Sequence, residues 1–385
     1  MKVISIGTDR NIFKKESAVR ARVTEYGALF EELHIVVFSR RALGHKKEQI
    51  SSNVWIYPSD SFLRIFYIKN TLRICVEILR DKKLTSANTV TTCQDPFETG
   101  IVGIKLKKKF DIPLHIQIHT DLFSPFFRYS SLLNWVRVHI AKKVLVKANA
   151  VRVVSKRIAD SLVAQKSLTI APMILSIFVD KEKIENTPIT TDLKKKYPKW
   201  NFIIFMASRL TKEKNIPLAI NVMQKLLLEY PSIGLVIVGS GTQEKNLRAL
   251  VLHTKLSNNV VFESWQNDLV SYYKTADLFL VTSDYEGFGM TIVEALFAHC
   301  PTISTDVGIA SDVLKDRVSF VCPVGDGECL LQKIKIFIKD NQLRETFTHE
   351  AVQRLASITD SSRAEYLQKY KASIEMAHEK VQKFL

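Results

Sequence analysis

Short runs of apolar residues alternate along the chain with longer segments in which apolar residues recur every three or four positions. The short runs predict buried strands, and the longer segments predict amphipathic helices. Such alternation is typical of an α/β fold with mostly parallel sheets. In the first half we expect strands at 2–7, 34–38, 54–57, 88–92, 114–118, 150–154 and 168–171, and helices near 16–31, 61–80, 97–109, 129–147 and 156–165.

The second half repeats the alternation. We expect strands near 202–207, 234–238, 259–263, 278–282, 302–305 and 319–322, and helices near 215–229, 242–255, 267–275, 289–299, 326–339 and 341–356. The stretch 172–200 holds three prolines and two charged runs, which mark a domain boundary. We therefore expect one domain over 1–180, a second over 181–360, and a final amphipathic helix over 361–385. The apolar positions of that helix are Tyr366, Tyr370, Ile374, Ala377, Val381 and Phe384.

Composition supports two packed domains. A chain of 385 residues exceeds what one core normally organises. Its longest apolar runs have the length of one strand, far below the ~18–20 residues of a membrane-spanning helix, and its start lacks the pattern of a signal peptide. The five cysteines form an odd set without CxxC spacing, so we expect reduced thiols, no zinc site and a cytoplasmic protein.

Charge is concentrated in the first half. The chain has a formal net charge of +16, and residues 1–180 alone contain 29 Lys and Arg against 15 Asp and Glu. Such asymmetry indicates nucleic acid, an anionic membrane surface or a polyanionic substrate as partner. Nucleic acid is disfavoured because no recognised nucleic-acid-binding motif accompanies the charge.

The segment 281–295 carries the most informative chemistry, since an apolar strand there breaks into a glycine-containing turn that opens a helix. Ligands of α/β sheets bind at such carboxyl ends of strands. The free N–H groups of the first helical turn, near Phe288 to Thr291, favour an anion such as a diphosphate. Glu286 and Glu294 flank this site, and carboxylates there suit vicinal sugar hydroxyls. The alternative is an ordinary helix cap and a solvated glutamate.

A second strand, turn and helix start covers 206–215. Arg209 and Lys214 stand in this turn, where both can neutralise a diphosphate. The alternative for basic residues in a loop is simple solvation.

Together the two segments resemble family 4 of the retaining GT-B glycosyltransferases, with its E-x7-E motif and R-L-x-x-x-K pattern. The resemblance implies two Rossmann-like domains facing each other across a cleft, with the last helix crossing back to the first domain. Arg209 and Lys214 would contact the donor diphosphate. Glu286 would contact the donor sugar and Glu294 the ribose. Backbone groups near the helix start would hold sugar and phosphate oxygens: Gly287, Phe288, Gly289, Met290 and Thr291.

Three weaker similarities follow in the order that the family has. Gly239 lies in a Gly-x-Gly turn after a strand, although a tight turn alone would explain it. Trp265 and Gln266 lie where such enzymes read the base, but Ser264 replaces the usual glycine. The segment 304–312 departs from the late family motif, and we assign it no chemistry.

His119 is the candidate from the first domain, because the family has a histidine facing the donor sugar after the corresponding strand. The alternative is a structural hydrogen-bonding role, and His115, deeper in the same strand, is the plainer structural histidine. The first loop, 7–17, lacks the Gly-Gly pair that many members have. It also lacks GxGxxG, which disfavours a nicotinamide cofactor.

Aromatic and basic residues are interleaved around 62–69 and 123–147. Phe126, Phe127 and Trp135, with Lys142 and Lys143, suit an interface with anionic lipid. The alternative is a set of amphipathic helices packed on their own sheet with solvated bases.

The resemblance implies transfer of a hexose from a UDP- or GDP-linked sugar to the hydroxyl of a sugar or a lipid-linked acceptor, with retention. No Asp-x-Asp occurs, so we expect no metal and no cofactor. The expected location is the cytoplasm, including the inner face of the plasma membrane. Two rivals stay open: a sugar-nucleotide epimerase or hydrolase on the same fold, and a non-catalytic sugar-nucleotide-binding membrane-associated protein.

Overall fold

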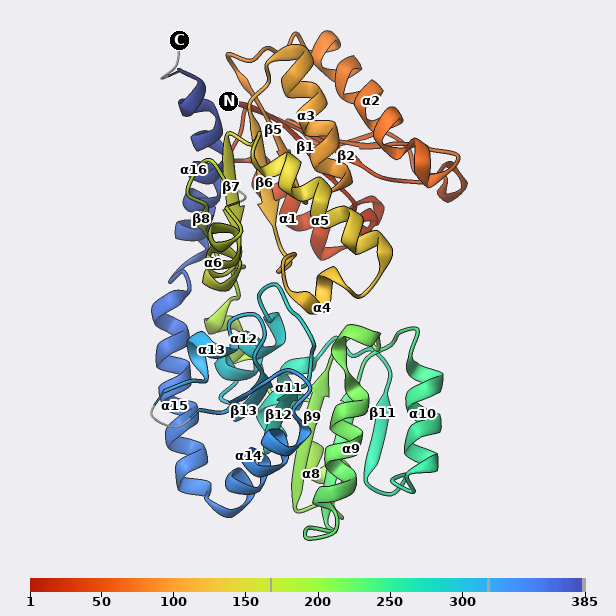
Figure 1. Cartoon of the computed structure of the whole chain (residues 1–385), viewed down its shortest axis with the longest axis vertical. Coiled ribbons are helices and arrows are strands. Elements are labelled where there is room, and N and C mark those ends of the chain that lie inside the picture. Colours follow the sequence, from red (N-terminus) through yellow and green to blue (C-terminus); the bar gives the residue numbers. More distant parts are fainter. Residues whose placement is uncertain (167, 317–318, 383–385) are drawn as a thin grey trace. The chain divides into compact units, whose positions relative to one another are not determined.

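A computed structural model describes residues 1–166, 168–316 and 319–382, and the chain divides into two compact units. Unit 1 comprises Met1–Ser176 and the chain from Arg363 onward, whereas unit 2 comprises Ile177–Ser362. Figure 1 shows the strands and helices of both. Among the described residues, no helix combines the length and apolarity needed to cross a membrane.

Unit 1 is built on an eight-stranded sheet in the order β3-β4-β2-β1-β5-β6-β7-β8. The edge strand β3 runs antiparallel to β4, and the other neighbouring pairs are parallel. The strands are β1 Lys2–Gly7, β2 Glu32–Val37, β3 Glu48–Ser51, β4 Val54–Pro58, β5 Thr89–Cys93, β6 Leu114–Ile118, β7 Ala150–Val153 and β8 Met173–Ile174.

Helices connect and cover this sheet. Helices α2, α3 and α5 pack side by side, and α16 lies on β5, β6 and β7 although it comes from the end of the chain. The helices are α1 Ala18–Gly27, α2 Tyr67–Asp81, α3 Glu98–Phe110, α4 Pro125–Arg128, α5 Leu132–Leu145, α6 Lys156–Ala164 and α16 Arg363–Gln382, with short 3-10 turns η1 Arg10–Phe13, η2 Arg41–Leu43 and η3 Arg64–Phe66.

Helix α16 follows the predicted apolar stripe. Tyr366, Tyr370, Ile374 and Ala377 are buried on the sheet of unit 1. Tyr370 also stacks on Tyr26 of α1, with ring centroids 4.4 Å apart. The expectation of a last helix that returns to the first domain is confirmed. The side chain of Val381 and the whole of Phe384 lie outside the described residues.

Unit 2 has a six-stranded parallel sheet in the order β11-β10-β9-β12-β13-β14. The strands are β9 Phe202–Ala207, β10 Ile233–Val238, β11 Val260–Glu263, β12 Leu278–Val281, β13 Thr302–Thr305 and β14 Val321–Cys322. The helices are α7 Lys181–Asn186, α8 Leu193–Lys196, α9 Ile216–Leu226, α10 Glu244–His253, α11 Leu269–Thr275, α12 Met290–Phe297, α13 Ala310–Val313, α14 Gly327–Lys339 and α15 Asn341–Ile358, with the 3-10 turn η4 Lys212–Lys214. Two mostly parallel sheets with helices packed on them confirm the α/β prediction of two Rossmann-like domains.

The structure differs from the sequence predictions in three places. Strand β3 was not predicted, because its sequence Glu-Gln-Ile-Ser has no buried apolar run. The strand expected at 168–171 lies instead at Met173–Ile174. Cys322 and Cys329 form a disulfide, with their Cα atoms 5.7 Å apart, because α14 begins directly after the short loop that follows β14. Cys75, Cys93 and Cys300 are free and buried.

Candidate functional site

The carboxyl ends of two neighbouring strands of unit 2 form the candidate site. Strands β9 and β12 are paired in parallel, so the loops that follow them leave the same edge of the sheet. The first loop carries Arg209 and Lys214, and the second carries Glu286. The fold therefore brings together Lys214 and Glu286, which lie 72 residues apart in sequence.

The predicted cation and carboxylate are in direct contact. Lys214 Nζ lies 2.5 Å from Glu286 Oε1, and the two side chains are only 14% and 18% exposed. Ser283 Oγ donates a second hydrogen bond, of 2.8 Å, to the same carboxylate oxygen. A largely desolvated cation is thus held at the edge of the sheet, beside a carboxylate.

Three further hydrogen bonds join the two loops. Thr282 Oγ1 donates to the carbonyl of Lys214 at 2.9 Å, and the N–H of Asp284 donates to the carbonyl of Glu213 at 2.8 Å. Asn215 Nδ2 donates to Asp284 Oδ1 at 2.9 Å from a left-handed backbone with φ of 44°. Burial raises the pKa of Asp284, and the bond from Asn215 opposes that shift. These contacts fix where Lys214 and Glu286 meet.

Arg209 differs from Lys214 in its exposure. Its side chain is 70% exposed, and its guanidinium lies 3.2 Å from Glu213 Oε1. Thr211 Oγ1 donates to the same oxygen at 2.6 Å. Since an exposed ion pair of this kind is weak, the guanidinium is available to a bound anion.

The start of α12 supplies backbone donors. Gly289 precedes the helix with φ of 93°, and among the described contacts no side chain caps the first turn at Met290 and Thr291. Phe288 is buried, and its carbonyl accepts a 3.0 Å hydrogen bond from the N–H of Ile309. Gly287 precedes Phe288 in the same turn. An uncapped helix start with a fixed approach is suited to binding an anion.

Glu294 lies one turn further along α12, against the core. Tyr273 OH donates to Glu294 Oε2 at 3.2 Å, and Tyr273 is itself buried. Burial raises the pKa of Glu294, and the hydrogen bond from Tyr273 opposes that shift. The carboxylate is therefore held in place by one phenol, with its remaining lone pairs able to accept from hydroxyl groups.

This arrangement makes a prediction for stability. Tyr273→Phe keeps the ring packed beside Phe205 and Phe279 but removes the donor to Glu294. We expect a loss of about 1.5–3 kcal/mol in unfolding free energy at pH values where Glu294 is ionised. Because the pKa of Glu294 is already raised, the loss should shrink as pH falls through that pKa and the group becomes protonated. Unfolding by denaturant over a series of pH values measures it.

Tyr272→Phe is the matched control. Tyr272 OH donates to Glu263 Oε2 at 2.6 Å. Lys196 Nζ and Tyr197 OH also donate to this carboxylate, at 2.7 Å and 2.6 Å. Burial raises the pKa of Glu263, but these hydrogen bonds outweigh it and hold the pKa below its ordinary value. The destabilisation in Tyr272→Phe should persist to lower pH than that in Tyr273→Phe. Identical pH profiles for the two variants would contradict this account.

The weaker candidates lie along the same edge. Gly239 follows β10 with φ of 150°, and a Cβ there would lie 1.9 Å from the carbonyl oxygen of Ser208, so only glycine fits. Trp265 and Gln266 follow β11, where Trp265 is 62% exposed and Gln266 is half-buried. An exposed indole is available for stacking on a flat ligand.

His119 belongs to unit 1, where it follows β6 and is exposed. His115 is fully buried, with Nδ1 2.8 Å from Thr92 Oγ1, and burial lowers the pKa of His115 to about 3. Of the two, only His119 can reach a ligand.

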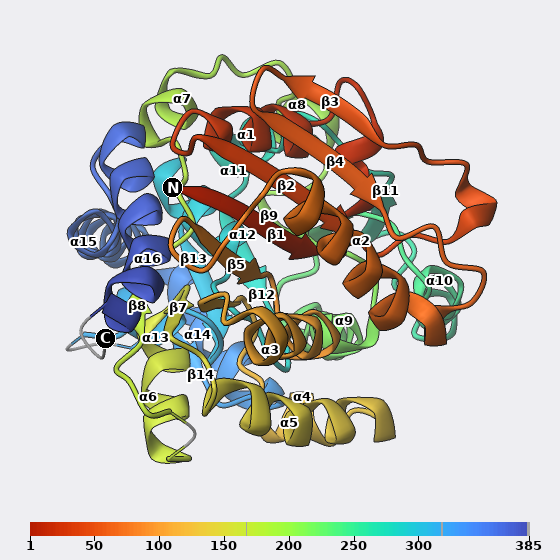
Figure 2. The ribbon, with the colours of Figure 1, turned by 90° about the horizontal axis from the view of Figure 1, so that it is seen from above.

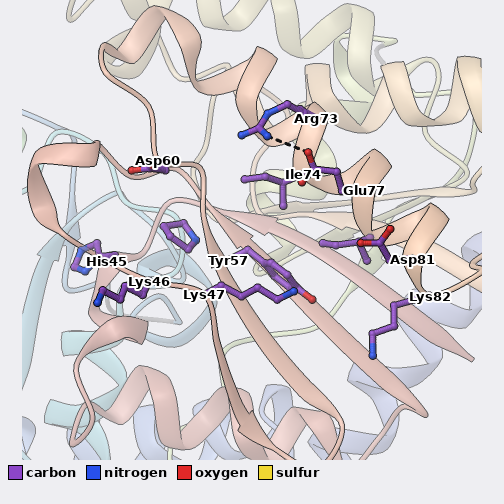
Figure 3. A pocket seen from close by; sticks show the side chains of 12 residues that line it. His45, Lys46, Lys47, Tyr57, Asp60, Arg73, Ile74, Glu77, Asp81 and Lys82 are labelled. Carbon is purple, nitrogen blue, oxygen red and sulfur yellow. Dashed lines mark hydrogen bonds and ion pairs between the residues drawn. The ribbon is translucent and has the colours of Figure 1, made fainter.

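Unit 1 also has a pocket of about 370 Å³ between the 45–47 loop, β4 and α2. Figure 3 shows Lys46 and Lys47 on the loop side and Arg73 on the helix side, where Arg73 pairs with Glu77 at 3.0 Å. Within the described residues, no group of three or more His, Cys, Asp or Glu side chains is arranged to hold a metal ion.

Sequence reasoning did not find several residues of this site. Glu213, Asn215, Asp284 and Tyr273 hold the predicted residues in place, and Gly308 contacts Phe288 from another loop. Glu213, Asn215 and Asp284 lie inside the two predicted segments, 206–215 and 281–295, and this position was the sequence signal for them.

The chain is similar to known glycosyltransferases. Residues 190–354 match the family described as "Glycosyl transferases group 1". The capsular polysaccharide biosynthesis glycosyltransferase CapM of Staphylococcus aureus is 27% identical over 205 residues, which cover 52% of this chain and 53% of CapM. The alpha-monoglucosyldiacylglycerol synthase of Acholeplasma laidlawii is 27% identical over 267 residues, or 65% of each chain. The matches thus span about half to two thirds of these relatives.

The fold is also shared with a solved structure. Anabaena Alr3699/HepE, in complex with UDP, superposes with a TM-score of 0.74 over 97% of this chain and 100% of that one. Sequence identity is 18%, so this likeness shows the fold alone. It is the fold that the sequence resemblance implied.

Proposed function

We propose that this chain, whose residues 190–354 match the glycosyl transferases group 1 family, transfers a hexose from a nucleotide-diphosphate sugar, UDP- or GDP-linked, to an acceptor hydroxyl with retention of configuration. The contact between Lys214 and Glu286 at the carboxyl edge of the unit 2 sheet carries the proposal. It joins a phosphate-type cation to a carboxylate that can accept from sugar hydroxyls, beside an uncapped helix start.

The donor diphosphate is the proposed ligand of Arg209 and Lys214. Negative charge builds on the leaving phosphate as the glycosidic bond breaks, and two fixed cations stabilise that charge. Lys214 would give up part of its contact with Glu286 and contact the donor phosphate instead. The departing phosphate oxygen itself accepts the acceptor proton, so the step needs no separate base.

Sugar and nucleoside have separate proposed partners. Glu286 accepts from the donor hexose, together with backbone groups of Gly287, Phe288, Gly289, Met290 and Thr291. Glu294, placed by Tyr273, accepts from the ribose hydroxyls. Trp265 and Gln266 flank the base, Gly239 lets the backbone approach it, and His119 of unit 1 contacts the donor sugar. No metal enters this scheme.

The proposed acceptor is a sugar or a lipid-linked sugar, in the synthesis of a cell-surface glycan or glycolipid. Two observations support it: the names of the two relatives, and the +14 charge of residues 1–180. We assign the reaction to the cytoplasmic side of the membrane.

Nucleotide binding tests the function. Thermal unfolding is measured with UDP, GDP and their sugar conjugates, since a ligand at 100 times its Kd stabilises the fold by ~2.7 kcal/mol. The nucleotide that shifts the transition is then supplied as its sugar conjugate with and without acceptor. Release of free sugar without acceptor would instead support a hydrolase, and no shift with any nucleotide would reject the donor site.

The two glutamates make a sharper prediction. Glu294→Ala should weaken binding of the free nucleoside diphosphate and of the sugar conjugate alike, by about tenfold or more, because it removes the acceptor for the ribose. Glu286→Ala should weaken chiefly the conjugate and its turnover. Isothermal titration with both ligands separates the effects. Equal losses of nucleoside diphosphate affinity in the two variants would show that the pair is misassigned.

A further inference from the structure

Two neighbouring loops of unit 1 expose a cluster of large apolar side chains. The loops are 38–47, which follows β2, and 59–66, which follows β4; we call their exposed surface the loop patch. They extend beyond the ends of these strands (Figure 2). Phe62 and Ile65 are 74% and 76% exposed. The apolar members of the loop patch are Leu43, Phe62, Leu63, Ile65 and Phe66.

Cations surround these apolar groups. Arg40, Arg41 and Arg64 are exposed in the loop patch itself, and Asp60 is the one acid in the two segments. Asp60 pairs with Arg41 at 3.3 Å, which leaves the patch with excess positive charge. Lys46 and Lys47, also exposed, continue this charge along the rim of the unit 1 pocket (Figure 3).

Hydrogen bonds from buried serines below the patch hold the two loops together. Ser39, Ser59 and Ser61 are fully buried below the patch. Ser59 Oγ donates to the carbonyl of Ser39 at 3.0 Å, and the N–H of Ser39 donates back to Ser59 Oγ at 2.9 Å. The N–H of Arg41 donates to the carbonyl of Ser61 at 3.0 Å. The apolar side chains are therefore presented from fixed backbone, so little ordering is required when they are buried against a partner.

The aromatic cluster around α4 and α5 fits a membrane less well than its sequence indicates. Phe127 is buried and lies 6.0 Å from the ring of Phe97, which corrects its prediction as an inserting residue. Arg137 is held by Glu98 at 2.9 Å. The other predicted aromatics, Phe126 and Trp135, are exposed, as are Leu132 and Leu133. This cluster is therefore apolar, but it has part of its charge paired inside the unit.

We propose that unit 1 docks on an anionic lipid bilayer through the loop patch. The apolar side chains enter the boundary between headgroups and acyl chains, and the surrounding cations meet lipid phosphates. Apolar groups interspersed with an excess of positive charge match a bilayer surface better than a protein partner, whose interface cores are depleted of charge. The inference deepens the proposed function, because docking would bring a lipid-linked acceptor to the enzyme.

Vesicle sedimentation of the full chain tests the proposal. One set of vesicles contains equal parts of phosphatidylcholine and phosphatidylglycerol, and the other contains phosphatidylcholine alone. The apolar variant is Phe62→Ser with Ile65→Ser, the charge variant is Lys46→Gln with Lys47→Gln, and the matched control is Leu132→Ser with Leu133→Ser on α5. All three variants exchange exposed side chains, and thermal unfolding checks that each variant folds.

Wild-type protein should bind the anionic vesicles preferentially. The charge variant should lose about fivefold in binding for each lysine at low salt, and little at 1 M salt, where the Debye length falls to ~3 Å. The apolar variant should lose at least about tenfold at both salt concentrations, because apolar burial is not screened. The α5 control should bind like the wild type.

Three results would overturn the proposal: no binding of wild-type protein to anionic vesicles at low salt, a loss in the α5 control equal to that in the apolar variant, or self-association abolished by Phe62→Ser with Ile65→Ser. UDP and GDP titrations on the same samples keep the two proposals apart. Vesicle binding without nucleotide binding would reject the donor site alone, and the converse would reject docking alone.

Discussion

Lys214→Ala is expected to slow glycosyl transfer by about 10²-fold or more, and Arg209→Ala by a similar factor. Each removes a fixed cation from the charge that develops on the leaving diphosphate. The two variants should differ in their free energy of unfolding, because Arg209 is 70% exposed whereas Lys214 is 14% exposed and paired with Glu286. Simple solvation, the alternative for basic residues in a loop, therefore describes Arg209 in this structure but not Lys214. Turnover at saturating donor and unfolding by denaturant measure the two effects.

Lys212→Ala is the matched control, since Lys212 stands in the same turn and is exposed. It should keep wild-type turnover. Arg209→Ala should leave the unfolding free energy within about 0.5 kcal/mol of wild type, as surface substitutions usually do. Lys214→Ala should lower it measurably, because Glu286 would be left half-buried without its cation. Wild-type turnover in either variant, with a confirmed donor, would remove the diphosphate assignment.

The sheets could be predicted from sequence because their strands are nearly continuous apolar runs. Strand β9, Phe202–Ala207, is buried at every position and was expected at the same bounds. Strand β3 could not be predicted, since an edge strand needs no apolar alternation. Helix bounds were less accurate than strand bounds: the helix expected over 129–147 begins at Leu132, after a separate short helix, α4, at Pro125–Arg128.

The candidate site was predictable where one motif carries its own chemistry. Glu286 and the glycines of its turn indicate an anion site within a few residues of sequence. The residues that fix the site were not predictable, because their roles depend on pairing between distant loops. Asn215 is an ordinary polar residue until the fold places it 2.9 Å from Asp284. Tyr273 is an ordinary core aromatic until α12 places Glu294 over its hydroxyl.

The errors have the same origin. Phe126 and Phe127 are adjacent in sequence and equally apolar, yet Phe126 is 46% exposed and Phe127 is buried. A one-residue step on a short helix turns a side chain from solvent to core, so composition cannot separate the two. Likewise, the seven-residue spacing of Cys322 and Cys329 matches no common pattern, and a strand–loop–helix turn brings them together.

Gly308→Ala should disturb the donor site from a loop outside both motifs. Gly308 has φ of 53°, and a Cβ there would lie 2.3 Å from the carbonyl oxygen of Phe288. The backbone must therefore move at the residue before Gly289, where α12 begins. We expect affinity for the nucleotide sugar to fall by about tenfold or more, equivalent to one charge-assisted hydrogen bond of about 1.5 kcal/mol. Titration with the donor conjugate measures it.

Gly325→Ala separates this effect from simple backbone strain. Gly325 also has a positive φ, of 82°, but a Cβ there would meet no atom within 4 Å. Gly325→Ala should lose about 1–2 kcal/mol of stability, because alanine disfavours this backbone region. Gly308→Ala should lose more, because its Cβ also clashes with the backbone of Phe288. Only Gly308→Ala should also lose donor affinity, since only its Cβ presses on Phe288. If the two variants bound donor equally well, the start of α12 would not be the anion site, and the backbone contacts assigned to Phe288 through Thr291 would fall with it.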